Sequence, residues 1–281
     1  MFKSDTNRLI KEALAEDLGS GDVTTQAINA GQQIVTGRII CRQNGIIAGV
    51  RIAEHVFMQQ DKNLNVKIDH NDGDRVEANE AIIVLEGSAA SILSAERVAL
   101  NFLSHLSGIA TLTDKYVKSI HHTKAKITDT RKTTPLLRAL EKEAVRAGGG
   151  VNHRHGLYDM VLLKENHIEA AGGIKSAVEQ THRFMQDNDL NLKIEVETRD
   201  LDEVHEALEC RIDRIMLDNM TLQEIREATA LINHQVEVEV SGGVTLDSVV
   251  EIAETGVDYI SVGALTHSAP AFNFTLLFDE S

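Results

Sequence analysis

The segment KIEVETRDLDEVHEALECRIDRIMLD, residues 193–218, decides the fold. Its first five residues form a short run rich in β-branched side chains, a helical segment follows, and a second short run, RIMLD, ends it. Parallel strands need a crossover connection of about this length, usually a helix. The segment is therefore predicted to be one strand–helix–strand unit.

The same pattern extends to both sides of this segment. The short apolar runs are KITDT, DMVLL, KIEVE, RIMLD, VEVEV and YISVG, centred on Ile127, Val161, Ile194, Ile215, Val238 and Ile260. The intervals between these centres are 34, 33, 21, 23 and 22 residues. Six such units predict a TIM-like α/β barrel that is incomplete, since eight units are usual. A doubly wound open sheet is the alternative.

The residues before the barrel predict an α+β sandwich. A helix is expected over 4–18, ended by Gly19, and another near 50–60. Short strands are expected at 34–41, 64–69 and 81–86, and one or two long helices at 91–121. We therefore expect an N-terminal domain over 1–110, a barrel over 111–267, and a tail, 268–281, that packs on the first domain.

The composition excludes several classes of partner. The chain has 281 residues, with 43 acidic and 28 basic side chains, so its overall field opposes nucleic acid and anionic membranes. Cys41 and Cys210 form no metal-binding spacing and are expected to be reduced, inert thiols. No run of about 18 apolar residues and no secretion signal is found, so we expect a cytoplasmic protein.

Every predicted strand brings a charged, polar or glycine terminus to the same edge. In barrels of this kind the chemistry lies where the strands end, because the loops there converge over the mouth. KITDT leads into Arg131 and Lys132, KIEVE carries Glu195 and Glu197, and VEVEV carries Glu237 and Glu239. The other ends are formed by Lys164, Glu165, Asn166 and His167; Asp218 and Asn219; Ser241, Gly242 and Gly243; and Gly263.

Two of these strands carry carboxylates at alternate positions. A lone buried carboxylate is costly unless it is paired, protonated or bound to a cation, so the repeated pattern favours a polar cavity. Gly242 and Gly243 precede a helix that we expect to start at Thr245, which would offer backbone N–H groups to a phosphate. Glu197 and Asp218 suit Mg²⁺, which prefers oxygen ligands.

Other chemistries lack their usual signatures. The histidines have no zinc-type spacing, and neither a Walker lysine loop nor a GxGxxG fingerprint occurs. No nucleophile triad is evident. The remaining pattern, cations with carboxylates and glycines, indicates a phosphorylated, multiply anionic substrate bound with a divalent metal.

At this point the sequence resembles the quinolinate phosphoribosyltransferase family, also called nicotinate-nucleotide pyrophosphorylase (carboxylating). The resemblance spans nearly the whole chain, and its central motif is highly specific. The motifs, in family order, are EDLGSGDVTT at 16–25, ERVALNFLSHLSGIAT at 96–111, DTRKTTPLLRALEKEAVRAGGGVNHRHGLYDMVLLKENH at 129–167, IEVE at 194–197, MLDN at 216–219, EVSGGV at 239–244 and ISVGALTHSAP at 260–270.

The resemblance implies phosphoribosyl transfer from phosphoribosyl pyrophosphate (PRPP) to quinolinate, with loss of CO2, to give nicotinate mononucleotide for NAD synthesis. It implies that Arg131, His153, Arg154 and Lys164 grip the quinolinate carboxylates, with Arg97 supplied by a neighbouring subunit of a homodimer or a hexamer of dimers. Lys132 and Thr133 would extend this cationic wall, with Lys132 meeting pyrophosphate. The resemblance places Glu197 and Asp218 near the ribose and Mg²⁺, and a 5-phosphate cradle at Ser241, Gly242, Gly243, Val262, Gly263 and Ala264. Lys132, Glu197 and Asp218 would be the catalytic residues.

Three alternatives stay open from the sequence. A relative acting on a different base would share most of these motifs. A Schiff-base aldolase would use Lys132 or Lys164 at a strand end. A catalytically silent ligand-binding protein is disfavoured by the intact set of cations and carboxylates. His155 departs from the apolar residue that the family has at this position, and it has no assigned role.

Overall fold

The computed structural model describes residues 4–279 and divides the chain into two compact units. Unit 1 comprises the chain up to Asp114, Thr134–Gly149 and the residues from Ser268 onward, and unit 2 comprises Lys115–Thr133 and Gly150–His267. This division differs from the expected domain boundaries mainly in residues 134–149, which we assigned to the barrel.

Unit 1 is built on an antiparallel four-stranded sheet with the order β12-β1-β5-β3, next to a small β2-β4 pair. Strand β12, near the C-terminal end of the chain, pairs with β1, so the sheet joins residues far apart in the sequence. The strands are β1 (Ile34–Cys41), β2 (Gly45–Ile46), β3 (Asn65–Ile68), β4 (Arg75–Val76), β5 (Ala81–Ser88) and β12 (Phe274–Phe278).

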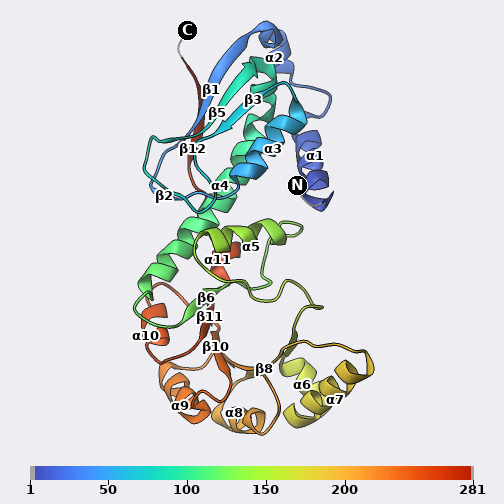
Figure 1. Cartoon of the computed structure of the whole chain (residues 1–281), viewed down its shortest axis with the longest axis vertical. Helices are drawn as coiled ribbons and strands as arrows, with labels where there is room; N and C mark the ends of the chain where they lie inside the picture. The colour runs from blue at the N-terminus through green and yellow to red at the C-terminus, as the bar shows by residue number, and fades with distance from the viewer. Residues whose placement is uncertain (1–3, 280–281) are drawn as a thin grey trace. The chain divides into compact units, whose positions relative to one another are not determined.

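Helices cover this sheet in layers. Helix α3 packs against β3, and α1 packs against α3, an order that can be followed in Figure 1. Helix α1 has the predicted limits, and the region expected to hold one or two long helices is the single helix α4, whose last five residues belong to unit 2. The helices are α1 (Ser4–Leu18), α2 (Val23–Ala27), the 3-10 turn η1 (Ala30–Gln32), α3 (Val50–Gln60), α4 (Ala89–Ser119) and α5 (Arg138–Ala147).

Unit 2 contains the six predicted parallel strands, in the order β6-β11-β10-β9-β8-β7. Within the described residues β6 and β7 do not pair with each other, so the barrel is incomplete, as predicted. The strands are β6 (Lys126–Thr128), β7 (Val161–Leu163), β8 (Ile194–Thr198), β9 (Arg214–Asp218), β10 (Glu237–Ser241) and β11 (Tyr259–Ser261).

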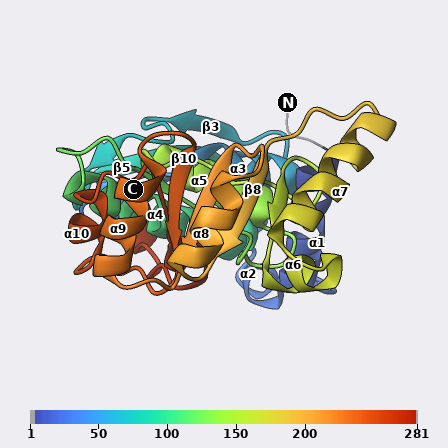
Figure 2. The same ribbon diagram turned by 90° about the horizontal axis from the view of Figure 1, so that it is seen from below.

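The helices of unit 2 lie outside the arc of strands, as the two views of Figures 1 and 2 show for α8, α9 and α10. They are α6 (Glu165–Ala171), α7 (Ile174–Asp187), α8 (Leu201–Leu208), α9 (Leu222–Ile232), α10 (Val249–Ala253) and α11 (Ala264–His267). None of the described helices, including the 31-residue α4, is long and apolar enough to cross a membrane.

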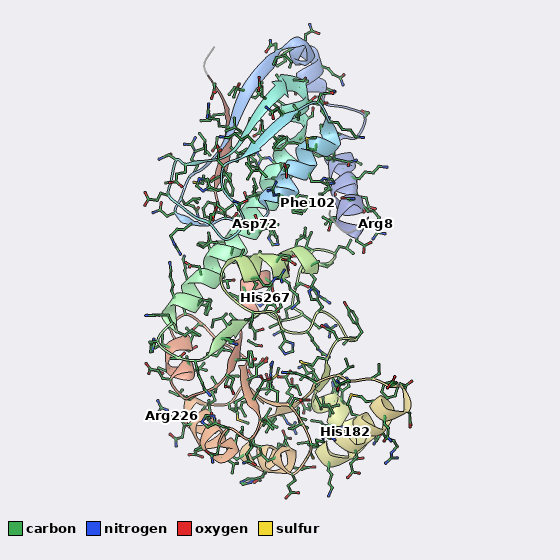
Figure 3. The ribbon with its side chains drawn as sticks, in the orientation of Figure 1. Arg8, Asp72, Phe102, His182, Arg226 and His267 are labelled. Carbon is green, nitrogen blue, oxygen red and sulfur yellow. The ribbon has the colours of Figure 1, made fainter. Side chains whose placement is uncertain are left out.

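Alternation along the parallel strands separates an apolar outer face from a polar inner face. Val196, Ile215 and Val240 alternate with the polar positions and are at most 2% exposed beneath the helical layer. Glu195 and Glu239 have the opposite parity and are also fully buried. Figure 3 shows side chains filling the space inside the arc, whereas Arg226 lies on the outer helical layer. Burial of apolar area stabilises the outer face, and the inner face must be stabilised by pairing of its charges.

The helix expected to start at Thr245 is a wrong prediction, because α10 starts at Val249. The backbone N–H of Thr245 donates instead to the Ser248 hydroxyl, 3.0 Å away, within an intervening turn. The helix N-terminus is therefore four residues further along the chain from Gly243 than we expected.

Candidate active site

The C-terminal ends of the parallel strands surround a pocket of about 530 Å³, formed entirely within unit 2. Ten of the predicted site residues line it together, although they are spread over more than 110 positions of sequence. They are Arg131, Lys132, His153, Arg154, Lys164, Glu197, Asp218, Ser241, Gly242 and Gly243.

The cations of the pocket come from three loops. Arg131 and Lys132 follow β6, Arg154 precedes β7, and Lys164 directly follows β7. Arg154 is 9% exposed and donates from Nη1 to the Met160 carbonyl oxygen, 3.2 Å away. Burial, and then the charge of Arg131, lower the pKa of Arg154. An anion bound between these cations would relieve their mutual repulsion.

The loop carrying His153 is held by Asp129, which our sequence reasoning did not select. Its buried carboxylate accepts from the His153 backbone N–H at 2.9 Å and from Asn152 Nδ2 at 2.6 Å. The position of Asp129 near the end of the predicted strand KITDT was the available signal. This contact fixes the loop against the end of β6.

Two carboxylates face the same pocket from neighbouring strands. Glu197 lies on β8 and forms an ion pair with the Lys164 ammonium, while Asp218 ends β9 and accepts from Asn219 Nδ2 at 2.7 Å. Mg²⁺ is commonly held by one or two carboxylates together with substrate phosphates. The donor chemistry of Glu197 and Asp218 therefore fits a magnesium ion.

The turn after β10 depends on glycine. Gly242 has φ = 99°, and a Cβ atom there would lie 2.2 Å from Asn219 Oδ1. Gly243 has φ = 60° but no heavy atom within 4 Å of the corresponding position. The backbone of this turn is therefore open on one side, where a phosphate could approach.

The described pocket wall does not include four of the other predicted residues: Thr133, Val262, Gly263 and Ala264. The Val262 N–H donates to the Thr128 carbonyl at 2.9 Å, which leaves it unavailable to a phosphate. A Cβ at Gly263 would lie 3.2 Å from Lys132 Cδ, so this glycine lets Lys132 pass. Ala264 is the first residue of α11, and Thr133 donates to the Arg131 carbonyl at 3.5 Å.

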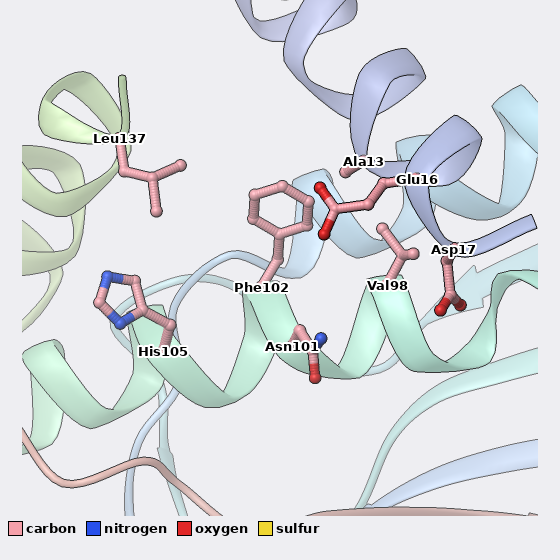
Figure 4. Close-up of a pocket in the computed structure, with 8 residues that line it drawn as sticks. All are labelled: Ala13, Glu16, Asp17, Val98, Asn101, Phe102, His105 and Leu137. Carbon is pink, nitrogen blue, oxygen red and sulfur yellow. The ribbon is translucent and has the colours of Figure 1, made fainter. Parts of the chain in front are cut away.

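Arg97 lies in the other unit, exposed on α4. The next residue, Val98, lines a separate hollow of about 400 Å³ within unit 1 (Figure 4), where Glu16 of α1 and Phe102 of α4 point toward one another. The described lining of this hollow offers two carboxylates, one amide and one imidazole between apolar walls and includes no arginine or lysine. It lacks the chemistry for an anionic substrate.

A buried charge cluster lies beneath the pocket, and we define it as His153, Glu195, Arg214 and Glu239. His153 Nε2 lies 3.1 Å from Glu195 Oε2 and 3.3 Å from Glu239 Oε1. Arg214 Nη1 donates to Glu239 Oε2 at 2.7 Å, and its guanidinium carbon lies 3.8 Å from the centre of the Tyr259 ring. The strand pattern indicated the two carboxylates but did not reveal their partners.

The cluster retains a proton to unusually high pH. Burial would lower the pKa of His153, but the hydrogen bonds and charges of Glu195 and Glu239 outweigh it and raise the pKa to about 9. Burial, and then Glu239, raise the pKa of Glu195. The Arg154 N–H donates to His153 Nδ1 at 2.8 Å, which opposes a proton on that nitrogen. The extra proton therefore belongs to the His153–Glu195 pair rather than to Nδ1 alone.

By its fold and its pocket, the protein belongs to the class of incomplete α/β barrels with a cation-rich pocket at the strand ends. Residues 22–107 match the model of the quinolinate phosphoribosyl transferase N-terminal domain, and residues 109–277 match that of its C-terminal domain. The chain therefore belongs to the quinolinate phosphoribosyltransferase family.

Individual relatives agree with this assignment. The chain is 43% identical to quinolinate phosphoribosyltransferase (decarboxylating) 1b of Nicotiana tabacum, over 98% of this chain and 83% of that one. It is 42% identical to the probable nicotinate-nucleotide pyrophosphorylase (carboxylating) of Bacillus subtilis, over 96% and 92%. The solved nicotinate-nucleotide pyrophosphorylase of Francisella tularensis superposes with a TM-score of 0.94 at 43% identity, covering 99% of this chain and 98% of that one.

Proposed function

We propose that the protein transfers the phosphoribosyl group of PRPP to quinolinate and releases pyrophosphate and CO2, forming nicotinate mononucleotide for NAD synthesis. Family membership supports this function. The observation that carries it is the single pocket in which four cations, two carboxylates and a glycine turn converge.

The quinolinate dianion binds against the cations. Arg131, Arg154 and Lys164 face its two carboxylates, with His153 beside them at the floor of the pocket. Each charge-assisted hydrogen bond contributes on the order of 1.5 to 3 kcal/mol. These contacts cancel the repulsion between quinolinate and the anionic PRPP.

PRPP binds at the other end of the pocket. The turn from Ser241 to Gly243 receives the 5-phosphate together with Gly263 and Ala264, and Lys132 meets the pyrophosphate. Glu197 and Asp218 lie near the ribose and would hold Mg²⁺, which when bound would neutralise charge on the pyrophosphate.

The chemistry requires no general base from the protein. The pyridine nitrogen of quinolinate attacks the anomeric carbon of PRPP as the bond to the pyrophosphate oxygen breaks, and pyrophosphate leaves with that electron pair. Positive charge develops on the ribose ring, which the nearby carboxylates stabilise. The bond to the 2-carboxylate then breaks, its electrons stay on the ring carbon beside the quaternised nitrogen, and a proton replaces the CO2.

A base-preference assay tests this function. Purified protein with PRPP and Mg²⁺ is expected to release pyrophosphate and CO2 with quinolinate and to show little activity with nicotinate. Efficient ribosylation of another pyridine or base, with no turnover of quinolinate, would show that the protein is a relative acting on a different base. A cytoplasmic location stays a prediction.

We further propose a homodimer, or a hexamer of dimers, in which Arg97 enters the site of the neighbouring subunit. Its exposure on α4, outside the unit that forms the pocket, supports this role. Mixing the inactive variants Arg97→Ala and Lys164→Ala is expected to restore activity, because each mixed dimer then contains one intact site. Random mixing gives about a quarter of the wild-type activity. Mixed dimers without activity would place each site within one chain.

A further inference from the structure

Glu239 stands at the centre of the buried charge cluster. Its side chain is fully buried, and its Oε2 accepts from Arg214 Nη1 at 2.7 Å. Its other oxygen, Oε1, faces His153 Nε2 at 3.3 Å and also accepts a hydrogen bond from the Ser261 hydroxyl. One carboxylate thus contacts a residue of the loop before β7 and a residue of β11.

The His153 contact leads toward the cationic end of the pocket. His153 Nδ1 accepts the backbone N–H of Arg154, so both ring nitrogens contact protein groups. A movement of the ring would therefore move the Arg154 backbone, whose side chain lines the pocket. The His153 ring is thus linked to Arg154, one of the cations that line the pocket.

The Ser261 contact leads toward the phosphate end. Ser261 is the last residue of β11 and lines the pocket, and it lies two residues before Gly263, where with Ala264 we expect the 5-phosphate. Its hydroxyl donates to Glu239 and so fixes the point where the strand passes into this turn.

Arg214 offsets the electrostatic cost of burying Glu195 and Glu239 side by side. Two buried carboxylates side by side would repel each other, but Arg214 and the proton of the His153–Glu195 pair together balance both charges. The cluster is thus neutral without any added cation.

We propose that Glu239 is a positioning residue that ties His153 to Ser261 beneath the substrates and so fixes the dicarboxylate end of the pocket relative to the phosphate end. The identity of these two ends rests on the proposed function. Glu195 contacts His153 and so supports the dicarboxylate end alone, whereas Ser261 supports the phosphate end alone.

Binding measurements on three variants test the proposal, with quinolinate and PRPP titrated separately by calorimetry. We expect Glu239→Gln to weaken the binding of both ligands about tenfold. The loss of one charge-assisted contact at each end of the pocket changes an affinity by roughly that factor. Glu195→Gln should weaken quinolinate only, and Ser261→Ala should weaken PRPP only. If Glu239→Gln leaves both affinities within about twofold of wild type, or affects one ligand alone, the proposal is wrong.

Glu237→Gln is the matched control. It makes the same substitution on the same strand and removes a negative charge paired with the same arginine, 3.0 Å away, but Glu237 lies at the opposite end of β10 from the pocket. We expect unchanged affinities for both ligands. Equal losses in Glu237→Gln and Glu239→Gln would show a general structural effect and overturn the proposal. Should Glu239→Gln not fold, Glu239→Asp makes the same test, since it keeps the charge but withdraws the carboxylate.

The ring of His153 provides a readout independent of activity. In protein with ¹⁵N-labelled histidine, the His153 ring signals are expected to shift in Glu239→Gln and to stay in place in Glu237→Gln. Unshifted signals in Glu239→Gln overturn the positioning role. If wild-type protein binds neither quinolinate nor PRPP, the proposed function fails, whereas shifted signals would still support the tie between Glu239 and His153.

Discussion

The floor and the rim of the pocket use charge in opposite ways. On the floor, the buried charge cluster pairs each carboxylate with a cation or a retained proton. On the rim, the cations Arg131, Lys132, Arg154 and Lys164 face only two carboxylates. Balanced charge beneath provides a fixed shape, and excess positive charge above provides affinity for anions, even in a chain with a net charge of −15.

The largest expected effect comes from breaking the balance of the floor. Arg214→Leu would leave Glu239 and Glu237 without their shared guanidinium, and removing one partner of a buried ion pair typically costs about 3 to 5 kcal/mol. Chemical denaturation of the variant should show a loss of this size. A loss below about 1 kcal/mol would show that the cluster adds little to stability.

An exposed ion pair provides the control for this prediction. Arg38 on β1 pairs with Asp279 at 2.8 Å, but both side chains are at least 40% exposed. Exposed pairs contribute about 0 to 1 kcal/mol, so Arg38→Leu should change stability little. The difference between the stability losses of Arg214→Leu and Arg38→Leu therefore measures the effect of burying an ion pair.

The next effect is a loss of stability at high pH. Folding raises the pKa of His153 from 6.5 to about 9, so the folded protein binds a proton that the unfolded chain releases. This contribution is complete below pH 6.5 and is lost as the pH rises through about 9. It amounts to at most about 3 kcal/mol. Denaturation curves between pH 6 and pH 10 should show the loss, and His153→Gln should remove this step; an unchanged step would assign it to another group.

On the rim, Arg131→Ala is expected to lower kcat/KM for quinolinate about 100-fold with the fold retained, because a planar guanidinium can hold a carboxylate through two bonds. Steady-state kinetics and circular dichroism would measure activity and folding together. Arg226→Ala, an exposed change on the outer helix α9, should leave both unaffected. A near-normal rate in Arg131→Ala would remove this residue from the substrate site.

Sequence patterns predicted the rim better than the floor. Lys164, Glu197 and Asp218 lie at or next to the C-terminal ends of their strands, and parallel strands bring these ends to one edge, so proximity follows from secondary structure alone. The intervals between apolar runs likewise predicted the six parallel strands, because each crossover has a characteristic length.

The floor depends on information that local patterns lack. The alternation on β8 and β10 indicates that Glu195 and Glu239 point inward, but the pairing of Glu239 with Arg214 depends on β9 lying beside β10. His153 belongs to a loop, and the tertiary contact of its backbone N–H with Asp129 helps to hold it within the cluster. The start of α10 was missed for a related reason, since the Thr245–Ser248 bond forms a turn where a helix was expected.

The smallest effect concerns the turn at the phosphate end of the rim. Gly242→Ala places a Cβ atom 2.2 Å from Asn219 Oδ1 at φ = 99°, so the turn or Asn219 must move. Backbone strain of this kind costs about 1 to 3 kcal/mol, and we expect about a tenfold weaker affinity for PRPP with quinolinate binding retained. Gly243→Ala is the matched control, because its Cβ would meet no atom within 4 Å although its φ of 60° also favours glycine. If calorimetry shows equal losses in both variants, backbone conformation rather than the close approach of Asn219 explains the need for glycine in this turn.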